Sequence, residues 1–340
     1  MTRHSLRHPP GVILTRTPLR VSFAGGGTDL SDFYEHDYGA VLSTAINKYI
    51  YVTLKRHGDI FDEKFRLSYS KSESVTTVDE VQNNIARECL RFLQIEPPIY
   101  ISTVGDLPAS TGLGSSSSFA VGLLNALHAF RGERVSAGQL AEEACYIEIE
   151  VLKEPIGKQD QYAAAFGGLN FFRFSPGGGV TVEPVRVKNG TLRSLFSHFM
   201  IFWTGHQRDT SRVLSEQKTN TACKLDHLSQ MRQHAHRLHS LVCNGHVDLE
   251  AFGAVLDQTW QLKRQLAHTI SNQKIDEWYE RAMKSGASGG KICGAGGGGF
   301  LLILAKPECQ EAVRNALRDL KEVPISYEVQ GSQVMLPFLD

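Results

Sequence analysis

The sequence predicts an α+β protein of two domains. Its 340 residues exceed the usual size of one domain, and 41% of them are hydrophobic, enough to build a full core. In the first part, predicted strands alternate irregularly with predicted helices, a pattern typical of α+β folds rather than of regular βαβ repeats. From residue 211 to residue 285 the pattern is almost wholly helical. This change predicts an N-terminal domain of residues 1–204 and a C-terminal domain of residues 205–340.

The first part of the chain is predicted to consist of strands and helices that lead to a glycine-rich loop. Apolar and β-branched runs predict a strand pair or a bent strand over 12–24, interrupted by Pro18, and further strands over 44–55, 66–69 and 99–104. Three glycines stop the first of these, and Thr28 with Asp29 opens a short helix. A longer helix is predicted over 78–93. The strand over 99–104 leads directly to the stretch 108–118.

The stretch 108–118 has the composition of a phosphate-binding loop. Gly112 and Gly114 have no Cβ atom, so the backbone can take positive φ there and turn several N–H groups toward one anion. Apolar residues at helical spacing follow, and Gly132 is placed to end that helix, so the serines lie on its first turn. The positive end of the helix dipole adds to the attraction for phosphate. A flexible Gly/Ser linker is the alternative, but Pro108 and an amphipathic helix bound this stretch.

The next segments carry acidic residues beside helix breaks. Ser136 with Gln139 predicts a capping box for a helix that runs to about residue 153. On a helical wheel, Glu148 and Glu150 fall on opposite edges of the apolar stripe, and the wheel does not choose between them. The pattern then predicts a short helix from 158 to 166, a hairpin of strands 169–174 and 180–187, and a strand over 198–203.

A second glycine cluster, residues 289–299, follows the helical region. It lies between a predicted helix and a predicted strand at 300–304, whereas a dinucleotide-binding fingerprint requires a strand before the loop and a helix after it. The Walker pattern also fails, because Ile292 stands where Ser or Thr should follow Gly-Lys. A helix over 307–320 and a strand over 325–329 complete the expected C-terminal unit.

The composition excludes several classes of partner. Lys+Arg and Asp+Glu number 36 each, so no overall field attracts nucleic acid or an anionic membrane. The six cysteines are scattered without a Cys-x-x-Cys pair, which suits reduced thiols in a cytosolic enzyme. No apolar run is long enough to span a bilayer. We therefore expect a cytoplasmic protein with no nucleic-acid or membrane partner; a homo-oligomer is compatible with the sequence.

Three separated stretches, 16–29, 108–118 and 291–300, resemble the GHMP kinases, the family that includes galactokinase, homoserine kinase and mevalonate kinase. The run Gly157-x-x-Asp160-Gln161 lies between the second and third stretches, as the family pattern requires. Within the family, the chain is most similar to the bacterial D-glycero-D-manno-heptose 7-phosphate kinases, with the fucose kinases next. The resemblance implies an N-terminal α+β domain with the phosphate loop, a C-terminal ferredoxin-like α+β domain, and an active site in the cleft between them.

The resemblance also implies the catalytic groups. Asp160 matches the catalytic aspartate, which would accept the proton of the attacking hydroxyl or at least orient it, and Arg20 would hold Asp160 ionised and offset charge on the transferred group. Glu148 lies at the offset of the family's magnesium glutamate, so Ser116 and Glu148 are expected to hold Mg²⁺. The ATP phosphates are expected on Gly112, Leu113, Gly114, Ser115, Ser116 and Ser117. Each of Arg20, Asp160 and Asp29, considered alone, could instead be a surface charge or a helix cap.

The sugar site is implied beside the first motif. Asp29 matches the acid that grips sugar hydroxyls, and the glycines before it replace the Gly-Glu-His of galactokinases, which argues against galactose. A substrate that already carries a phosphate needs a second anion site, for which the chain offers basic residues near the predicted cleft. The expected substrate-binding residues are Gly26, Gly27, Thr28, Asp29, Lys158, Arg208, Arg212, Gly296 and Gly297. The second glycine cluster would pack against the phosphate loop and substrate, or form only a tight structural turn.

These implications predict an ATP-dependent sugar kinase with ATP and Mg²⁺ as cofactors. It would phosphorylate the anomeric hydroxyl of D-glycero-D-manno-heptose 7-phosphate to give the 1,7-bisphosphate, which feeds nucleotide-activated heptose for capsule or lipopolysaccharide. Two alternatives stay open: a fucokinase-like kinase of a free sugar, and a non-catalytic sugar sensor on the same fold.

Overall fold

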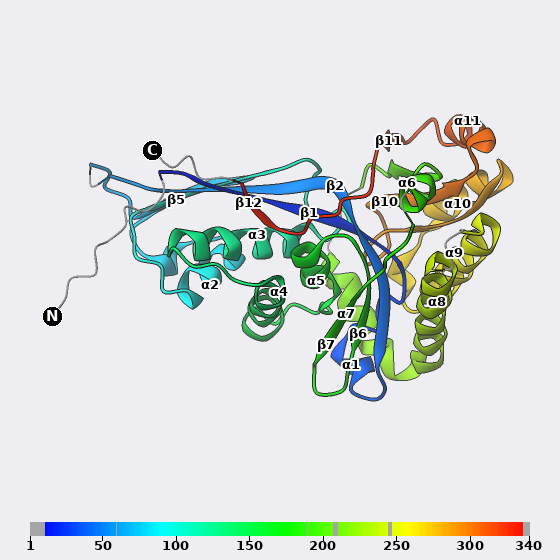
Figure 1. The fold of residues 1–340 in the computed structure, drawn as a ribbon, viewed down its shortest axis with the longest axis horizontal. Coiled ribbons are helices and arrows are strands. Elements are labelled where there is room, and N and C mark those ends of the chain that lie inside the picture. Colours follow the sequence, from blue (N-terminus) through cyan, green and yellow to red (C-terminus); the bar gives the residue numbers. More distant parts are fainter. Residues whose placement is uncertain (1–10, 59, 189, 207–209, 244–246, 336–340) are drawn as a thin grey trace.

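The computed structural model describes residues 11–58, 60–188, 190–206, 210–243 and 247–335. Within these residues the strands form one eight-stranded and one four-stranded sheet, each associated with helices (Figure 1). The predicted two-part α+β architecture is confirmed. None of the described helices combines the length and the apolar character needed to cross a membrane.

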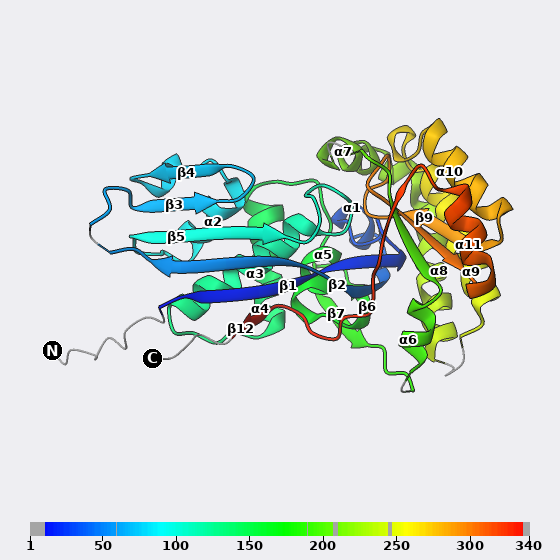
Figure 2. The same cartoon turned by 90° about the horizontal axis from the view of Figure 1, so that it is seen from above.

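The eight-stranded sheet has the order β12-β1-β2-β5-β3-β4, and in addition β6 pairs with β2 and β7 pairs with β6. Strand β1 runs unbroken through Pro18 and pairs antiparallel with β2, and the predicted interruption is only a shift of register between Pro18 and Leu19. Figure 2 looks onto the broad face of this sheet. The strands are β1 (Ile13–Ala24), β2 (Gly39–Arg56), β3 (Phe65–Ser68), β4 (Ser72–Val75), β5 (Ile99–Gly105), β6 (Leu169–Phe174), β7 (Val180–Pro184) and β12 (Gln333–Met335).

Helices cover the opposite face of this sheet (Figure 1). They are α2 (Asn84–Phe92), α3 (Ser115–Phe130), α4 (Ala137–Cys145), a π-helical turn at Tyr146–Val151, and α5 (Gln159–Phe166). Helix α3 lies directly against β1, where a methyl group on Gly122 would be only 2.6 Å from the Thr17 hydroxyl oxygen. Gly132 adopts a φ of 75° just beyond α3, as expected for the residue that ends a helix. This buried helix fixes the phosphate loop against the sheet.

The four-stranded antiparallel sheet has the order β11-β8-β10-β9. Numbered in chain order this is 4-1-3-2, the strand order of ferredoxin-like units. Its strands are β8 (Phe199–Trp203), β9 (Ala287–Ile292), β10 (Phe300–Ala305) and β11 (Lys321–Val323). Its helices are α7 (Thr210–Asn220), α8 (Leu225–Cys243), α9 (Leu249–Arg264), α10 (Gln273–Lys284) and α11 (Pro307–Ala316). Short helices occur at α1 (Ser31–Tyr34), α6 (Thr191–Phe196), Val78–Glu80, Thr221–Lys224 and His268–Ile270.

Several predicted elements differ in detail. The strand predicted over 325–329 is only an isolated bridge of Tyr327 to Ile46, and the edge strand β11 precedes it. The second glycine cluster begins inside strand β9, because Gly289 and Gly290 pair with Leu304 and Ile303 of the neighbouring strand β10. At Ser136 only half of the capping box forms, since the side chain of Gln139 bonds Glu143 instead. Strand β4 and helix α6 were not predicted.

The two sheets do not divide the chain strictly at the predicted boundary between residues 204 and 205. Strand β8 precedes that boundary but pairs with β10 and β11, because its apolar residues complete the core of the smaller sheet. Strand β12, close to the end of the described chain, returns to pair with β1 of the larger sheet. The boundary between residues 204 and 205 stays a prediction. A functional cavity is expected where the two parts of the chain meet.

Candidate active site

A cavity of about 630 Å³ is lined by residues from both parts of the chain. Residues of β1, the loop after it, the phosphate loop and α5 contribute from the N-terminal part, and residues of α7, α9, β9 and the second glycine loop from the C-terminal part. We call the part around residues 112–117 and Glu148 the phosphate-loop end. We call the part around Ser22, Gly26, Gly27, Asp29 and Gln159 the Asp29 end.

The phosphate loop adopts the backbone conformation that its glycines predicted. Gly112 and Gly114 have φ of 84° and 77°, and α3 begins at the next residue, Ser115. A methyl group on Gly112 would lie 2.4 Å from the carbonyl oxygen of Cys293, so the second glycine loop approaches the phosphate loop too closely for any side chain. The expected contact between the two loops is therefore present. It closes one wall of the cavity.

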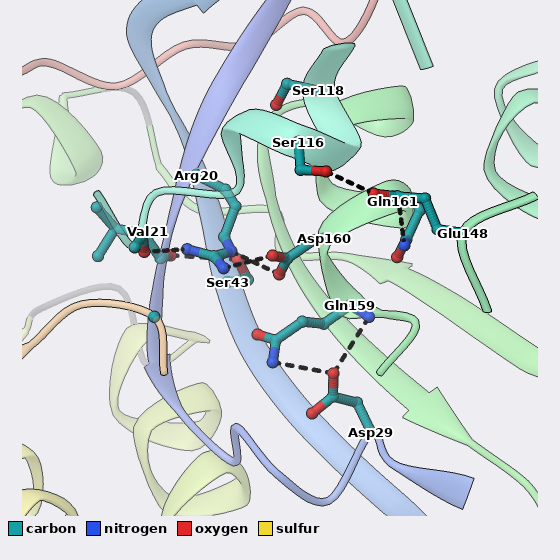
Figure 3. A network of polar contacts seen from close by, with 12 residues as sticks. Arg20, Val21, Asp29, Ser43, Ser116, Ser118, Glu148, Gln159, Asp160 and Gln161 are labelled. Atoms are coloured by element: carbon teal, nitrogen blue, oxygen red, sulfur yellow. Dashed lines mark hydrogen bonds and ion pairs between the residues drawn. The ribbon is translucent and has the colours of Figure 1, made fainter. Parts of the chain in front are cut away.

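Arg20 and Asp160, which both line the cavity, form an ion pair (Figure 3). Arg20 Nε and Nη2 donate to the two carboxylate oxygens at 2.7 and 2.6 Å, and Nη1 donates to the carbonyl oxygen of Gly112 at 2.7 Å. Burial acts to lower the pKa of Arg20, but the charge of Asp160 and its hydrogen bonds outweigh this effect and raise it. The guanidinium is thus a fixed positive charge that links the phosphate loop to Asp160.

Glu148 lies at the phosphate-loop end on the π-helical turn. Its carboxylate is 1% exposed and accepts hydrogen bonds from Ser116 Oγ at 2.8 Å and Gln161 Nε2 at 2.7 Å. Burial raises its pKa to about 7. The side chain of Glu150, by contrast, is 62% exposed and contacts Lys153. The structure thus separates two glutamates that the wheel could not, because a π-helical turn changes the angle between successive side chains.

The pair of Ser116 and Glu148 fits a divalent cation. A buried carboxylate beside a hydroxyl offers the hard oxygen ligands that Mg²⁺ prefers, and burial raises the pKa of Glu148, an effect that a bound cation would oppose. Among the described residues, no three His, Cys, Asp or Glu side chains are grouped as a complete metal site. A cation held here would therefore take most of its ligands from bound phosphates and water, as Mg²⁺ commonly does.

Asp29 is buried at the other end of the cavity. Its Oδ1 accepts from the backbone N–H of Gly27 at 2.8 Å, and its Oδ2 accepts from Gln159 Nε2 at 3.0 Å (Figure 3). A methyl group on Gly157 would lie 2.1 Å from Asp29 Oδ2, so this glycine permits the loop before α5 to reach the carboxylate. Burial raises the pKa of Asp29, and the nearby charge of Asp160 raises it further.

Most of the residues predicted for the site line this cavity. They are Arg20, Gly26, Gly27, Asp29, Gly112, Gly114, Ser115, Ser116, Ser117, Glu148 and Asp160. Two members of the predicted motifs do not line it. Thr28 is fully buried and bonds the carbonyls of Gly25 and Ala40, and Leu113 is fully buried with its carbonyl on the N–H of Arg20. These two residues hold the loops in shape.

Two of the three basic residues predicted to bind a substrate phosphate, Lys158 and Arg212, do not line the cavity. Lys158 is not in its lining, and its ammonium group donates to the carbonyl oxygen of Gly178 at 2.6 Å, at the turn between β6 and β7. Arg212 is exposed on α7 and also lies outside the lining. Arg208 lies outside the described residues. Sequence spacing locates such residues along the chain, but it does not determine where their side chains point.

The second glycine loop lines the cavity at a different point from the one expected. Gly294 and Ala295 line it, whereas Gly296 and Gly297 do not. A methyl group on Gly296 would be 2.5 Å from the side chain of Ile270, and the N–H of Gly297 donates to the carbonyl of Ile270. These two glycines therefore pack against the segment before α10 instead of the cavity.

Sequence reasoning assigned no role to several polar residues of the lining, among them Ser22, Gln159, Lys263 and Lys291. Ser22 is two residues after Arg20 on β1, and Gln159 directly precedes Asp160, so strand alternation and adjacency were signals for both. Lys291 is a charged residue in an otherwise apolar and glycine-rich stretch, which was also a signal. Lys263 lies on a long helix with no distinguishing local pattern.

Two family profiles match the chain. Residues 78–168 match the profile described as GHMP kinases N terminal domain, and residues 241–322 match the profile described as GHMP kinases C terminal. The two matches include the phosphate loop, Glu148, Asp160 and the second glycine loop.

Individual relatives extend over nearly the whole chain. The D-glycero-alpha-D-manno-heptose 7-phosphate kinase of Campylobacter jejuni is 30% identical over 320 residues, covering 90% of this chain and 93% of that protein. The L-fucokinase/L-fucose-1-P guanylyltransferase of Bacteroides fragilis is 24% identical over 350 residues, and the match spans 36% of that longer protein. Among solved structures, a D-glycero-D-manno-heptose 1-phosphate kinase from Bacteroides thetaiotaomicron has a TM-score of 0.79 at 24% identity, covering 96% of this chain and all of that one.

Proposed function

Since the chain belongs to the GHMP kinase family, we propose that it uses ATP to phosphorylate the anomeric hydroxyl of D-glycero-D-manno-heptose 7-phosphate, giving the 1,7-bisphosphate. Membership of this family and the heptose phosphate kinase relative make the protein a sugar kinase. The choice of this sugar rests on the 30% identity to the Campylobacter enzyme over 90% of the chain.

The observation that carries the proposal is the position of the Arg20–Asp160 pair. It lies between the phosphate loop, to which Arg20 Nη1 is bonded, and the Asp29 end, where a buried carboxylate can accept hydrogen bonds from sugar hydroxyls. An acceptor hydroxyl held near Asp160 would therefore face the γ-phosphate of an ATP molecule bound on the loop. Such positioning and charge compensation are the main requirements of phosphoryl transfer.

In the proposed reaction, the Asp160 carboxylate accepts the proton of the anomeric hydroxyl as its oxygen attacks the γ-phosphorus. The bond from the γ-phosphorus to the β,γ-bridging oxygen breaks, and ADP leaves with that oxygen. The Arg20 guanidinium offsets negative charge on the transferring group, while the N–H groups of the phosphate loop hold the remaining phosphate oxygens. Both Asp160 oxygens accept from Arg20, but a carboxylate has about four lone-pair positions and can accept a further hydrogen bond.

The proposed metal ion is Mg²⁺, held by Ser116 and Glu148. A bound Mg²⁺ would neutralise charge on the ATP phosphates and orient them for in-line transfer. The residues around it contribute in their own right, because Gln161 fixes one oxygen of Glu148 and leaves the other directed at Ser116.

The experiment is a substrate comparison with three sugars: D-glycero-D-manno-heptose 7-phosphate, the unphosphorylated heptose, and fucose. ADP release gives kcat/KM for each, and ³¹P NMR of the product identifies the esterified carbon. We expect the heptose phosphate to exceed the free heptose by at least ~30-fold, the scale of about 2 kcal/mol for one charged pairing. Equal efficiency for both heptoses, or a preference for fucose, would promote the kinase of a free sugar. No ADP release with any sugar would favour a non-catalytic sensor.

We also propose a biosynthetic role. The 1,7-bisphosphate carries an anomeric phosphate, the group from which nucleotide-activated sugars are made. As the resemblance implies, its use would be in nucleotide-activated heptose for capsule or lipopolysaccharide.

A further inference from the structure

Two buried lysines reach the cavity from the C-terminal part of the chain. Lys291 on β9 is 2% exposed, and its Nζ donates to the carbonyl oxygen of Ser22 at 2.7 Å. Lys263 on α9 is 5% exposed, and its Nζ donates to the carbonyl oxygen of Gly294. Both side chains line the cavity. Lysine is among the residues least often buried, so two in one cavity require an explanation.

The positive charges of these two lysines and of Arg20 act on one buried thiol, that of Cys293. Burial raises the pKa of Cys293, and the positive charges of Lys291, Arg20 and Lys263 oppose that increase. Burial and, to a smaller extent, the charge of Arg20 lower the pKa of Lys291 to about 8, although Cys293 acts to raise it. Arg20 has Asp160 as its partner, whereas the charged neighbours that act on Lys291 include no carboxylate among the described residues. Lys291 thus carries a buried positive charge that an anionic ligand would compensate.

An unpartnered hydroxyl lies beside Lys291. Ser22 is 7% exposed, lines the cavity, and its Oγ has no hydrogen-bond partner in the part of the chain that the structure describes. Because its backbone carbonyl holds Lys291 Nζ, the hydroxyl and the ammonium group belong to one residue pair. A buried hydroxyl without a partner costs free energy unless a ligand supplies an acceptor.

The position along β1 separates Ser22 and Lys291 from the phosphate loop, whereas Lys263 bonds Gly294, which lies against Gly112 of that loop. Arg20 bonds the loop through its N–H and its side chain, whereas Ser22 is two residues further along the strand, about 7 Å at the usual rise per residue. Ser22 lies toward Gly26, where a methyl group would be 3.7 Å from Ser22 Oγ and 3.5 Å from Gln159 Nε2. The hydroxyl and its lysine therefore belong to the Asp29 end. An acceptor molecule could reach them while its reacting hydroxyl lies near Asp160.

We propose that Lys291, Lys263 and Ser22 form a second anion site that binds the terminal phosphate of the acceptor sugar. The inference rests on the proposed function, because it concerns the substrate of the same cavity. It replaces Lys158 and Arg212 as the source of positive charge for that phosphate. The two ammonium groups supply charge, and the Ser22 hydroxyl donates a hydrogen bond to a phosphate oxygen.

The test compares kcat/KM for heptose 7-phosphate with kcat/KM for free heptose in wild type and in Lys291→Met, Lys263→Met and Ser22→Ala. Lys291→Met keeps the length of the side chain and removes its charge, and Lys291→Arg restores a charge. We expect Lys291→Met to reduce the preference for the phosphorylated sugar at least ~10-fold, with KM for ATP changed less than twofold, and Lys291→Arg to recover part of the preference. Lys263→Met should act in the same direction, and Ser22→Ala more weakly. Lys284→Met, on the exposed face of α10, is the control and should leave the ratio unchanged.

The outcomes separate the two levels of the proposal. If wild type shows no preference for the phosphorylated sugar, the proposed substrate is wrong. If wild type shows the preference but Lys291→Met and Lys263→Met retain it, the proposed function stands and the anion site is overturned. The site is also overturned if Lys158→Met removes the preference instead, or if the lysine variants raise only the KM for ATP.

A measurement on the wild type guards against variants that fail to fold. With ATP saturating, inorganic phosphate should inhibit competitively against heptose 7-phosphate. Competition against ATP alone would assign the lysines to the nucleotide and overturn the proposal.

Discussion

At the phosphate-loop end of the cavity, the loop itself, the first turn of α3 and their backbone N–H groups come from one continuous segment, whereas the Asp29 end is assembled from β1, the loop after it, α5 and β9. The first end depends on backbone conformation, which glycines at fixed positions dictate locally. The second depends on contacts between segments more than 200 residues apart, such as the hydrogen bond from the Lys291 ammonium group to the backbone carbonyl of Ser22. If the two ends differ in this way, substitutions at the phosphate-loop end should change the kinetics with ATP and Mg²⁺, and substitutions at the Asp29 end should change the kinetics with the sugar.

Asp160 lies between the two ends, and its loss should have the largest effect. Asp160→Asn removes the carboxylate that would accept the hydroxyl proton, so we expect kcat to fall at least ~100-fold with every sugar while ATP still binds. Steady-state kinetics and the Tm with and without ATP provide the measurement. Turnover close to that of wild type in a folded variant would remove Asp160 from the mechanism and leave the two ends without a common centre.

Substitutions at Glu148 should give the next largest effect, and they test whether the phosphate-loop end acts on Mg²⁺ and ATP without acting on the sugar. Glu148→Gln and Ser116→Ala remove ligands of the proposed cation, so each should raise the Mg²⁺ concentration for half-maximal activity at least ~10-fold. Glu150→Gln is the matched control from the same turn, and its exposed side chain should make no difference. The preference between phosphorylated and free heptose should stay as in wild type. A shift with Glu150→Gln instead would reverse the assignment.

Gln159 offers the corresponding test at the Asp29 end. Its amide donates to Asp29 Oδ2, so Gln159→Ala should release that carboxylate and raise the KM for sugar about 3- to 10-fold, the value of one ordinary hydrogen bond. The KM values for ATP and Mg²⁺ should not change. Gln139→Ala on the exposed first turn of α4 serves as the control. Equal changes for sugar and nucleotide would show that the ends are not separable.

The pH dependence of stability should give the smallest effect. The pKa of Glu148 is about 7 in the folded metal-free protein and near 4.5 when unfolded, so its contribution to stability is fully present below pH 4.5 and is lost as pH rises through 7. Glu148→Gln should therefore raise the Tm of metal-free protein at pH 8 by roughly 2 to 5 °C, and by less at pH 5. Mg²⁺ with ATP should remove the difference by stabilising the wild type. Differential scanning calorimetry at the two pH values decides it; an equal gain at both would mean that Glu148 is not a buried charge.

The contrast between a loop set by local conformation and an end assembled from distant segments also explains what could be predicted from the sequence. The loop around Gly112 and Gly114, the helix after it, and the glycine at its end follow from local conformational preferences, and the structure has them as predicted. The two-part α+β architecture followed from hydrophobic periodicity. The strand predicted over 325–329 was wrong, because a short edge segment pairs according to its neighbours rather than its own composition.

The sequence by itself determined which residue types are available for phosphate, metal and proton chemistry, and it located Arg20, Asp29, Glu148 and Asp160 through their motifs. Only the tertiary structure decided the directions of side chains. In the folded protein, the Lys158 ammonium group donates to the carbonyl oxygen of Gly178, Glu148 is buried and Glu150 is exposed. The physical reason is that burial and hydrogen bonding of a charged side chain depend on which distant segments pack around it, and spacing along one segment does not contain that information.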